Sequence, residues 1–224
     1  LTVDASALKS AISFTAGSVG SGMTVTTGAW QASTDVTLSA KSDTITVGST
    51  GAVDVDIDGA GGTDTVNLTV KAGFVDTANI DNVENLNFTV NAGDDITIGA
   101  TSTANTQADA IADATTVKIL GGNSLSTFEV GDANAASSDN ITAAVDIDAT
   151  AFEGNVYLEY ADGIFTASTD VDAGSLATDT VFAIFDTANT DIALPLTGVE
   201  TFIADVDSGN DGSEQYDFDV DGAT

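Results

Sequence analysis

Residues 53–70 read VDVDIDGAGGTDTVNLTV, and this stretch decides the fold class. On each side of a central Gly-rich segment, apolar and polar residues alternate with a period of two. Such alternation puts the apolar side chains on one face of an extended strand and the polar ones on the other, which is typical of a half-buried β-strand. The Gly residues between the two runs are typical of a turn. The stretch therefore predicts strand, turn and strand.

The same alternation recurs along most of the chain, and Gly, Asn, Asp and Ser clusters separate the runs. Further strands are expected at Val36–Leu38, Ile45–Val47, Leu86–Val90, Ile96–Ile98, Val117–Ile119, Val145–Ile147, Val156–Tyr160, Val181–Phe185, Phe202–Val206 and Tyr216–Val220. Residues 4–12 and 103–114 could be helical, although the second stretch could equally be a long exposed loop. We expect an all-β protein with about a dozen short strands.

Two motifs occur twice in the chain with nearly the same spacing. The tetrapeptide Thr63–Val66 (TDTV) recurs at Thr178–Val181, and Asn82–Phe88 (NVENLNF) is matched by Gly198–Ala204 (GVETFIA). The Asp of the first motif precedes the Glu of the second by 20 residues in one copy and by 21 in the other. Duplication with drift indicates a stacked or tandem architecture. We expect a β-rich segment at 1–49, a first repeat unit at 50–130 and a second at 131–224.

The charge of the chain excludes several classes of function. Its 224 residues include 35 Asp and Glu, only four basic residues, no His and no Cys, which gives a formal net charge of −31. Nucleic-acid binding needs cationic side chains, and catalysis by a His-activated Ser or Cys needs residues that this chain lacks. Two carboxylates suffice for a glycosidase, but nothing in the sequence marks one of Glu153 and Glu159 as buried and the other as exposed. We therefore expect no enzyme and no nucleic-acid partner. Because the sequence has no run of about 18 apolar residues, we also expect no membrane span.

The acid is patterned, and the pattern predicts divalent cations as ligands. Carboxylates at alternate positions of a strand lie about 7 Å apart on one face and repel by about 0.6 kcal/mol even in water. Calcium would relieve this repulsion, since it binds six to eight carboxylate, carbonyl and water oxygens. The alternative is solvated acid without a specific metal. The predicted ligands are Asp54, Asp56, Asp58, Gly59, Gly61, Asp64, Asp94, Asp95, Asp205, Asp207, Asn210, Asp211, Asp217, Asp219 and Asp221.

The segment Gly59–Asn67 (GAGGTDTVN) resembles the nonapeptide of repeats-in-toxin proteins. Together with the downstream Val-Glu motif, it resembles the repeat units of repeats-in-toxin-type bacterial S-layer proteins and large calcium-binding surface proteins. The likeness covers roughly residues 50–98 and 170–208. It implies a secreted, calcium-dependent β-solenoid that assembles into a two-dimensional coat. The Asp and turn positions of the family map onto Gly59, Gly61, Gly62 and Asp64.

These observations lead to one main expectation and one alternative. We expect a parallel β-helix or β-solenoid in preference to tandem β-sandwich modules. It would be an extracellular, calcium-stabilised structural subunit of an S-layer or cell-surface filament, with further copies of itself as partners. The alternative is a calcium-dependent adhesin or glycan-binding module whose partner is surface polysaccharide. Glu84 and Glu200 are expected to be structural and to accept backbone N–H groups at a turn.

Overall fold

The computed structural model describes most of the chain, and all its regular structure is β-strand. The described residues are 1–8, 13–29, 34–50, 55–72, 78–98, 111, 113–130, 141, 145–160, 170–174, 179–184, 191–205 and 217–221. The all-β prediction is confirmed for this part of the chain. A helix does not begin at residue 4, because Asp4 and Ala5 belong to a strand that pairs in parallel with its neighbour. Residues 113 and 114 are not helical, and most of the other expected helix lies outside the described residues.

The strands form three parallel sheets. The largest has ten strands, in the order β1 (Thr2–Ala5), β3 (Thr24–Thr27), β5 (Thr44–Thr50), β7 (Thr65–Val70), β9 (Asn85–Val90), β11 (Thr116–Gly121), β13 (Asp146–Phe152), β15 (Val171–Asp172), β17 (Asp191–Thr197) and β19 (Asp217–Asp221). A four-stranded sheet contains β2 (Ser13–Thr15), β4 (Thr34–Thr37), β6 (Val55–Asp58) and β8 (Ala78–Asp81). A five-stranded sheet contains β10 (Asp95–Ile98), β12 (Thr127–Val130), β14 (Asn155–Tyr160), β16 (Thr180–Ile184) and β18 (Thr201–Asp205).

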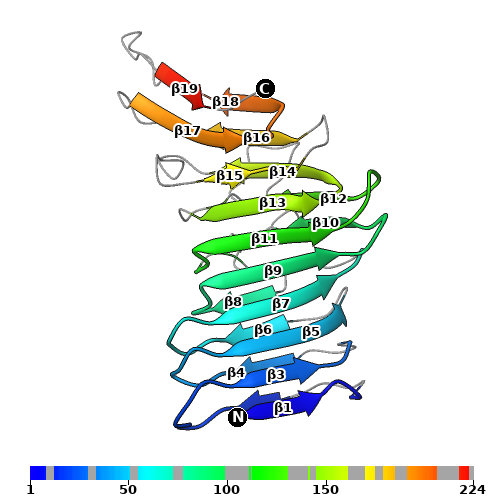
Figure 1. Ribbon diagram of the computed structural model, residues 1–224, viewed down its shortest axis with the longest axis vertical. Coiled ribbons are helices and arrows are strands. Elements are labelled where there is room, and N and C mark those ends of the chain that lie inside the picture. The colour runs from blue at the N-terminus through cyan, green and yellow to red at the C-terminus, as the bar shows by residue number, and fades with distance from the viewer. Residues whose placement is uncertain are drawn as a thin grey trace.

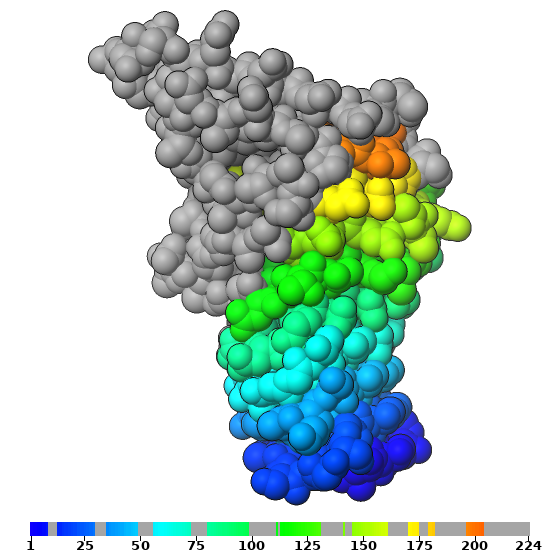
Figure 2. Space-filling view, turned by 60° about the vertical axis from the view of Figure 1, so that its left-hand side comes forward, coloured from blue at the N-terminus to red at the C-terminus, as the bar shows by residue number. Residues whose placement is uncertain are grey.

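Consecutive strands lie in different sheets, so the chain alternates between two layers as it advances. Figure 1 shows the strands stacked in chain order, with the two termini at opposite ends. Figure 2 shows the same progression of colour along the surface. Parallel pairing joins strands that are two apart in the sequence, as in β5 with β7 and β7 with β9. The result is a repetitive, solenoid-like arrangement of parallel strands.

The register of the strands stacks like residues on like. In the ten-stranded sheet Val66 pairs with Leu86 and Leu68 with Phe88, and all four are buried. The inward faces of the two layers share one apolar cluster, which includes Ile80 of the four-stranded sheet. Each fully buried side chain of this size contributes about 1.5–3 kcal/mol, so the core spreads its stabilisation along the stack.

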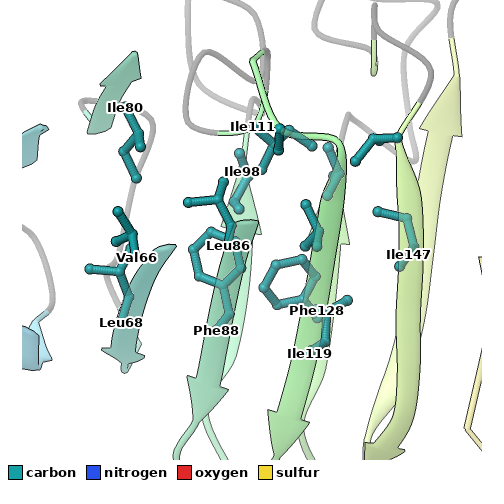
Figure 3. Packing of buried hydrophobic residues seen from close by; sticks show 14 of the residues in the cluster. Val66, Leu68, Ile80, Leu86, Phe88, Ile98, Ile111, Ile119, Phe128 and Ile147 are labelled. Atoms are coloured by element: carbon teal, nitrogen blue, oxygen red, sulfur yellow. The ribbon is translucent and has the colours of Figure 1, made fainter. Parts of the chain in front are cut away.

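Aromatic residues fill the middle of this core. Phe88 on β9 and Phe128 on β12 face one another from the two layers, with ring centroids 5.4 Å apart and planes at 51° (Figure 3). A tilted pair at this distance is a favourable arrangement of two rings. Residues from both layers therefore meet directly here. The described part of the chain contains no helix with the length and apolar character needed to cross a membrane.

Candidate functional site

Some of the predicted calcium ligands lie on the outward face of the four-stranded sheet. Asp56 on β6 is in register with Asp35 on β4, and Asp58 is in register with Asp81 on β8. Neighbouring strands are about 4.8 Å apart, so each pair of like charges repels by about 0.9 kcal/mol even at the dielectric constant of water. The outer surface of this sheet is therefore strongly acidic.

The other predicted ligands either lie outside the described residues or are placed at separate strands and turns. Four lie outside the described residues: Asp54, Asp207, Asn210 and Asp211. Four have strand positions in β18 and β19: Asp205, Asp217, Asp219 and Asp221. Asp94 lies in the turn before β10, where its N–H donates to the Asn91 carbonyl at 3.1 Å, and Asp95 is the first residue of β10. These positions remain predictions as metal ligands.

The Gly-rich turn from Gly59 to Asp64 connects β6 to β7, and its own polar groups close it. The Asp58 carboxylate accepts the Ala60 N–H at 2.8 Å and the Asn82 side-chain amide at 2.9 Å. Gly62 has φ +127°, and a Cβ there would lie 2.5 Å from the backbone carbon of Lys41. A residue other than Gly would be both strained and obstructed at this position. The turn is thus packed against the preceding rung, and Asp58 acts as its cap.

Asp64 points into the protein and bridges three successive rungs. Its side chain is 0% exposed, and its Oδ1 accepts the backbone N–H of Asp43 at 2.7 Å. Its own N–H donates to Glu84 Oε2 at 2.7 Å. Both bonds satisfy N–H groups at residues that directly precede strands of the ten-stranded sheet, where buried donors need partners. The carboxylate that resembles a metal ligand in sequence is therefore used to order the backbone.

Asp43 continues this chain of bonds one rung earlier, and sequence reasoning missed it. Its Oδ1 accepts the Met23 N–H at 2.6 Å, and its Oδ2 accepts the Ser39 N–H at 2.6 Å and the Ser39 hydroxyl at 2.8 Å. The available signal was the match of Asp43-Thr44-Ile45 to Asp64-Thr65-Val66 at a distance of 21 residues. Asp43 is only 2% exposed, and its carboxylate accepts these three hydrogen bonds.

The second copy of the sequence repeat builds the same arrangement on the other layer. Asp179 Oδ1 accepts the Val156 N–H at 2.9 Å, and the Asp179 N–H donates to Glu200 Oε2 at 3.1 Å. Asp179 directly precedes β16, and Glu200 directly precedes β18, both in the five-stranded sheet. The structural role predicted for Glu84 and Glu200 is confirmed. We call Asp43, Asp64, Glu84, Asp179 and Glu200 the strand-start carboxylates.

Two of the strand-start carboxylates have an oxygen without a hydrogen-bond partner. Asp64 Oδ2 and Asp179 Oδ2 are buried and accept no bond. Burial raises the pKa of Asp64 to about 6. The hydrogen bond from the Asp43 N–H lowers this pKa, and the negative charges of Asp43 and Glu84 raise it further. Burial likewise raises the pKa of Asp179 to about 6, with Glu200 adding to it and the Val156 N–H opposing it. These carboxyls bind a proton more tightly than an exposed Asp does.

The described residues do not by themselves fit a closed calcium site. No group of three or more Asp or Glu among them is arranged to hold a metal ion. The Asp64 carboxylate is fully buried, and its unpartnered Oδ2 lies 2.8 Å from the place where a Cβ on Gly59 would be. Calcium takes six to eight oxygens, and the described residues around Asp64 offer no group of three acidic side chains that could hold it. In the described part of the turn, the Asp64 oxygens are therefore suited to N–H donors and to a proton.

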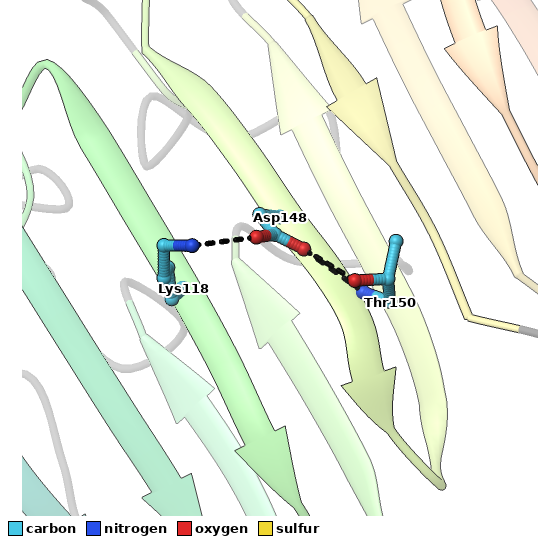
Figure 4. A network of polar contacts seen from close by, with 3 residues as sticks. All are labelled: Lys118, Asp148 and Thr150. Atoms are coloured by element: carbon cyan, nitrogen blue, oxygen red, sulfur yellow. Dashed lines mark hydrogen bonds and ion pairs between the residues drawn. The ribbon is translucent and has the colours of Figure 1, made fainter.

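One ion pair crosses the outer face of the ten-stranded sheet. Lys118 Nζ on β11 lies 2.8 Å from Asp148 Oδ2 on β13, and Thr150 donates its hydroxyl to Asp148 Oδ1 at 2.7 Å (Figure 4). The bond from Lys118 is the main cause that lowers the pKa of Asp148, and the same bond raises the pKa of Lys118. Both side chains are largely exposed, so this network links two neighbouring strands with little effect on stability.

Comparisons with known proteins provide no family for this chain. No protein-family model, no curated protein and no solved structure matches it. Its function is therefore inferred from its own residues and their arrangement.

Proposed function

We propose that the chain closes into a parallel β-solenoid and serves as an extracellular structural protein, a subunit or segment of an S-layer or cell-surface filament. The observation that carries this proposal is the in-register parallel stacking of strands from one end of the chain to the other. Each rung buries its apolar face against the next, so such a stack is an elongated and stiff building unit.

The distribution of chemistry along the stack supports a structural role. The buried acids Asp43, Asp64 and Asp179 accept backbone N–H groups of neighbouring rungs. Such bonds fix rung spacing and leave those oxygens unavailable to a substrate. The resemblance of residues 59–67 and of the downstream Val-Glu motif to repeats-in-toxin-type surface proteins points in the same direction. We propose that this chain is similar to them in location and assembly.

Calcium belongs to this proposal as the counter-ion of the acidic outer surface. A chain with a net charge of −31 repels its copies at low ionic strength. Divalent cations between the outward Asp residues of neighbouring copies would remove that repulsion and link the subunits. The in-register pairs Asp35–Asp56 and Asp58–Asp81 provide such positions on one sheet. Assembly would then depend on the free calcium concentration.

Calcium titration of chelated protein tests both parts of the proposal. We expect heat of binding in isothermal calorimetry and ordered sheets or fibres by negative-stain microscopy once calcium is added. Replacing Asp56 and Asp58 by Asn should weaken uptake, whereas Asp64→Asn should leave it unchanged, because the described Asp64 oxygens are buried. Protein that stays dispersed in millimolar calcium and instead binds a glycan array would overturn the structural role in favour of an adhesin.

A further inference from the structure

The outward face of strands β3, β5, β7 and β9 carries no charged side chain. In these four strands every outward side chain that the structure describes belongs to Thr or Asn: Thr24, Thr26, Thr44, Thr46, Thr65, Asn67, Thr69, Asn85, Asn87 and Thr89. All ten are exposed or half-buried, and their register aligns them in rows across the sheet. We call this surface the Thr/Asn face.

Hydrogen bonds along one row hold the middle of the Thr/Asn face in place. Asn87 Nδ2 donates to Asn67 Oδ1 at 2.8 Å, and Asn67 Nδ2 donates to Thr46 Oγ1 at 3.3 Å. A ladder of this kind fixes the side-chain rotamers before any partner arrives, so binding costs less conformational entropy. The face is therefore an ordered polar surface.

The contrast in charge with the opposite layer is sharp. The four-stranded sheet, which shares the core with these strands, presents Asp35, Asp56, Asp58 and Asp81 in two in-register pairs. On a chain with a net charge of −31, the Thr/Asn face is a surface on which no carboxylate has to be desolvated. The centres of protein interfaces are depleted of charged residues for this reason. A second copy of the chain meets less repulsion here than over the acidic sheet.

We propose that the Thr/Asn face is a contact between copies, in which the same face of a second chain packs against it. This inference rests on the self-assembly put forward under the proposed function and adds the surface through which it occurs. The partner face has the same row spacing of about 4.8 Å, so two faces related by a two-fold axis match in period.

The size of the face indicates that a single contact through it is weak and that only an array of many such contacts is stable. Four strands about 4.8 Å apart and about six residues long cover roughly 400 Å². A standard stable interface buries about 800 Å² on each partner, so this face alone does not make a tight dimer. Many such contacts in an array add through multivalency.

Placing either charge at the centre of the face tests the proposal. Asn67→Asp and Asn67→Lys change the net charge in opposite directions, yet each brings like charges together in a two-fold contact. Like-charge juxtaposition costs several kcal/mol, so we expect both variants to associate at least about tenfold more weakly than the parent chain. Thr37→Asp, on the outward face of the acidic four-stranded sheet, is the matched control, and in the absence of calcium it should associate like the parent.

Sedimentation velocity at rising protein concentration, with and without calcium, measures the association, and far-UV circular dichroism checks that each variant is folded. If the parent associates and both Asn67 variants associate equally well, the Thr/Asn face is not the contact, while the proposed assembly stands. If Asn67→Lys strengthens association, net charge rather than this face controls it, and the inference is overturned. A parent chain that never associates overturns the proposed function and the contact with it.

A neutral polysaccharide is the rival occupant of the same surface. Pull-down with an insoluble neutral glycan distinguishes the two. If the Asn67 variants lose glycan binding but keep normal self-association, the face belongs to the glycan and the self-contact is refuted.

Discussion

The buried carboxyl of Asp179 makes the stability of this protein depend on pH in a way that one substitution removes. In Asp179→Asn the side-chain oxygen that accepts the Val156 N–H is kept, and the group that titrates is lost. The amide places a buried N–H₂ where the unpartnered Oδ2 was, which costs about 1–3 kcal/mol at every pH. That cost is the same at every pH. The informative quantity is therefore how the difference in free energy of unfolding between Asp179→Asn and the parent changes with pH.

The pKa of Asp179 sets the size and the sign of that change. It is about 6 in the folded protein against an ordinary value of 3.8, a difference that corresponds to about 3 kcal/mol. Because the folded-state pKa is raised, the protonated carboxyl contributes its stability fully below pH 3.8, and this contribution is lost as the pH rises through about 6. The Asn variant has no such loss. Its stability relative to the parent should therefore rise by about 2–3 kcal/mol between pH 4 and pH 7.

Urea denaturation followed by far-UV circular dichroism at pH 4, 5, 6 and 7 measures this difference. Asp35→Asn removes the same charge from an exposed strand position and serves as the control for general repulsion among the many carboxylates. A second variant, Glu200→Gln, keeps an acceptor for the Asp179 N–H but removes the neighbouring charge, so it should reduce the pH dependence in part. If the difference between the parent and Asp179→Asn is the same at all four pH values, the raised pKa is refuted.

Three further predictions concern the turn, the core and the ion pair. Gly62→Ala should destabilise the protein by about 1–3 kcal/mol in urea denaturation, because φ is +127° and the new Cβ meets the Lys41 backbone; an equal denaturation midpoint would contradict this packing. Phe88→Ala should cost about 3–5 kcal/mol, since it opens a cavity beside Phe128 in the shared core; a cost under about 1 kcal/mol would mean that the layers are not packed together. Lys118→Gln should lower the thermal midpoint slightly at pH 7, and this difference should vanish as the pH falls through the lowered pKa of Asp148; a difference that persists in acid would show that the ion pair is not its source.

Much of the local structure could be read from the sequence. Alternation such as that in residues 65–70 and 85–90 predicted strands that the structure contains. The duplicated motifs predicted equivalent structure, and Asp64–Glu84 and Asp179–Glu200 form the same bond in their two copies. Such features follow from chemistry within a few residues, because side-chain alternation and turn composition are properties of a short segment.

The position of each acid relative to the core could not be read in the same way. Asp56 and Asp64 both belong to the patterned stretch, yet the first is exposed and the second is fully buried. Their difference depends on which residue lies one rung away. Asp64 accepts a hydrogen bond from the Asp43 N–H, whereas Asp56 is in register with another outward carboxylate, Asp35. The sequence treated both as metal ligands because it shows charge and spacing but not the neighbours.

The sequence by itself determined that this protein is built of short β-strands, that it repeats two motifs, and that it carries a net charge of −31. The tertiary structure decided that the strands pair in parallel, two elements apart, and that the four-stranded sheet is acidic on its outward face whereas strands β3, β5, β7 and β9 carry no charge. The physical reason is that an alternating strand pattern is the same for parallel and antiparallel pairing. In the described part of the chain, the strand-start carboxylates bond to residues 20–23 positions away, and only the stacking of rungs brings such residues together. The bonds between Asp43 and Ser39, within one turn, are the exception.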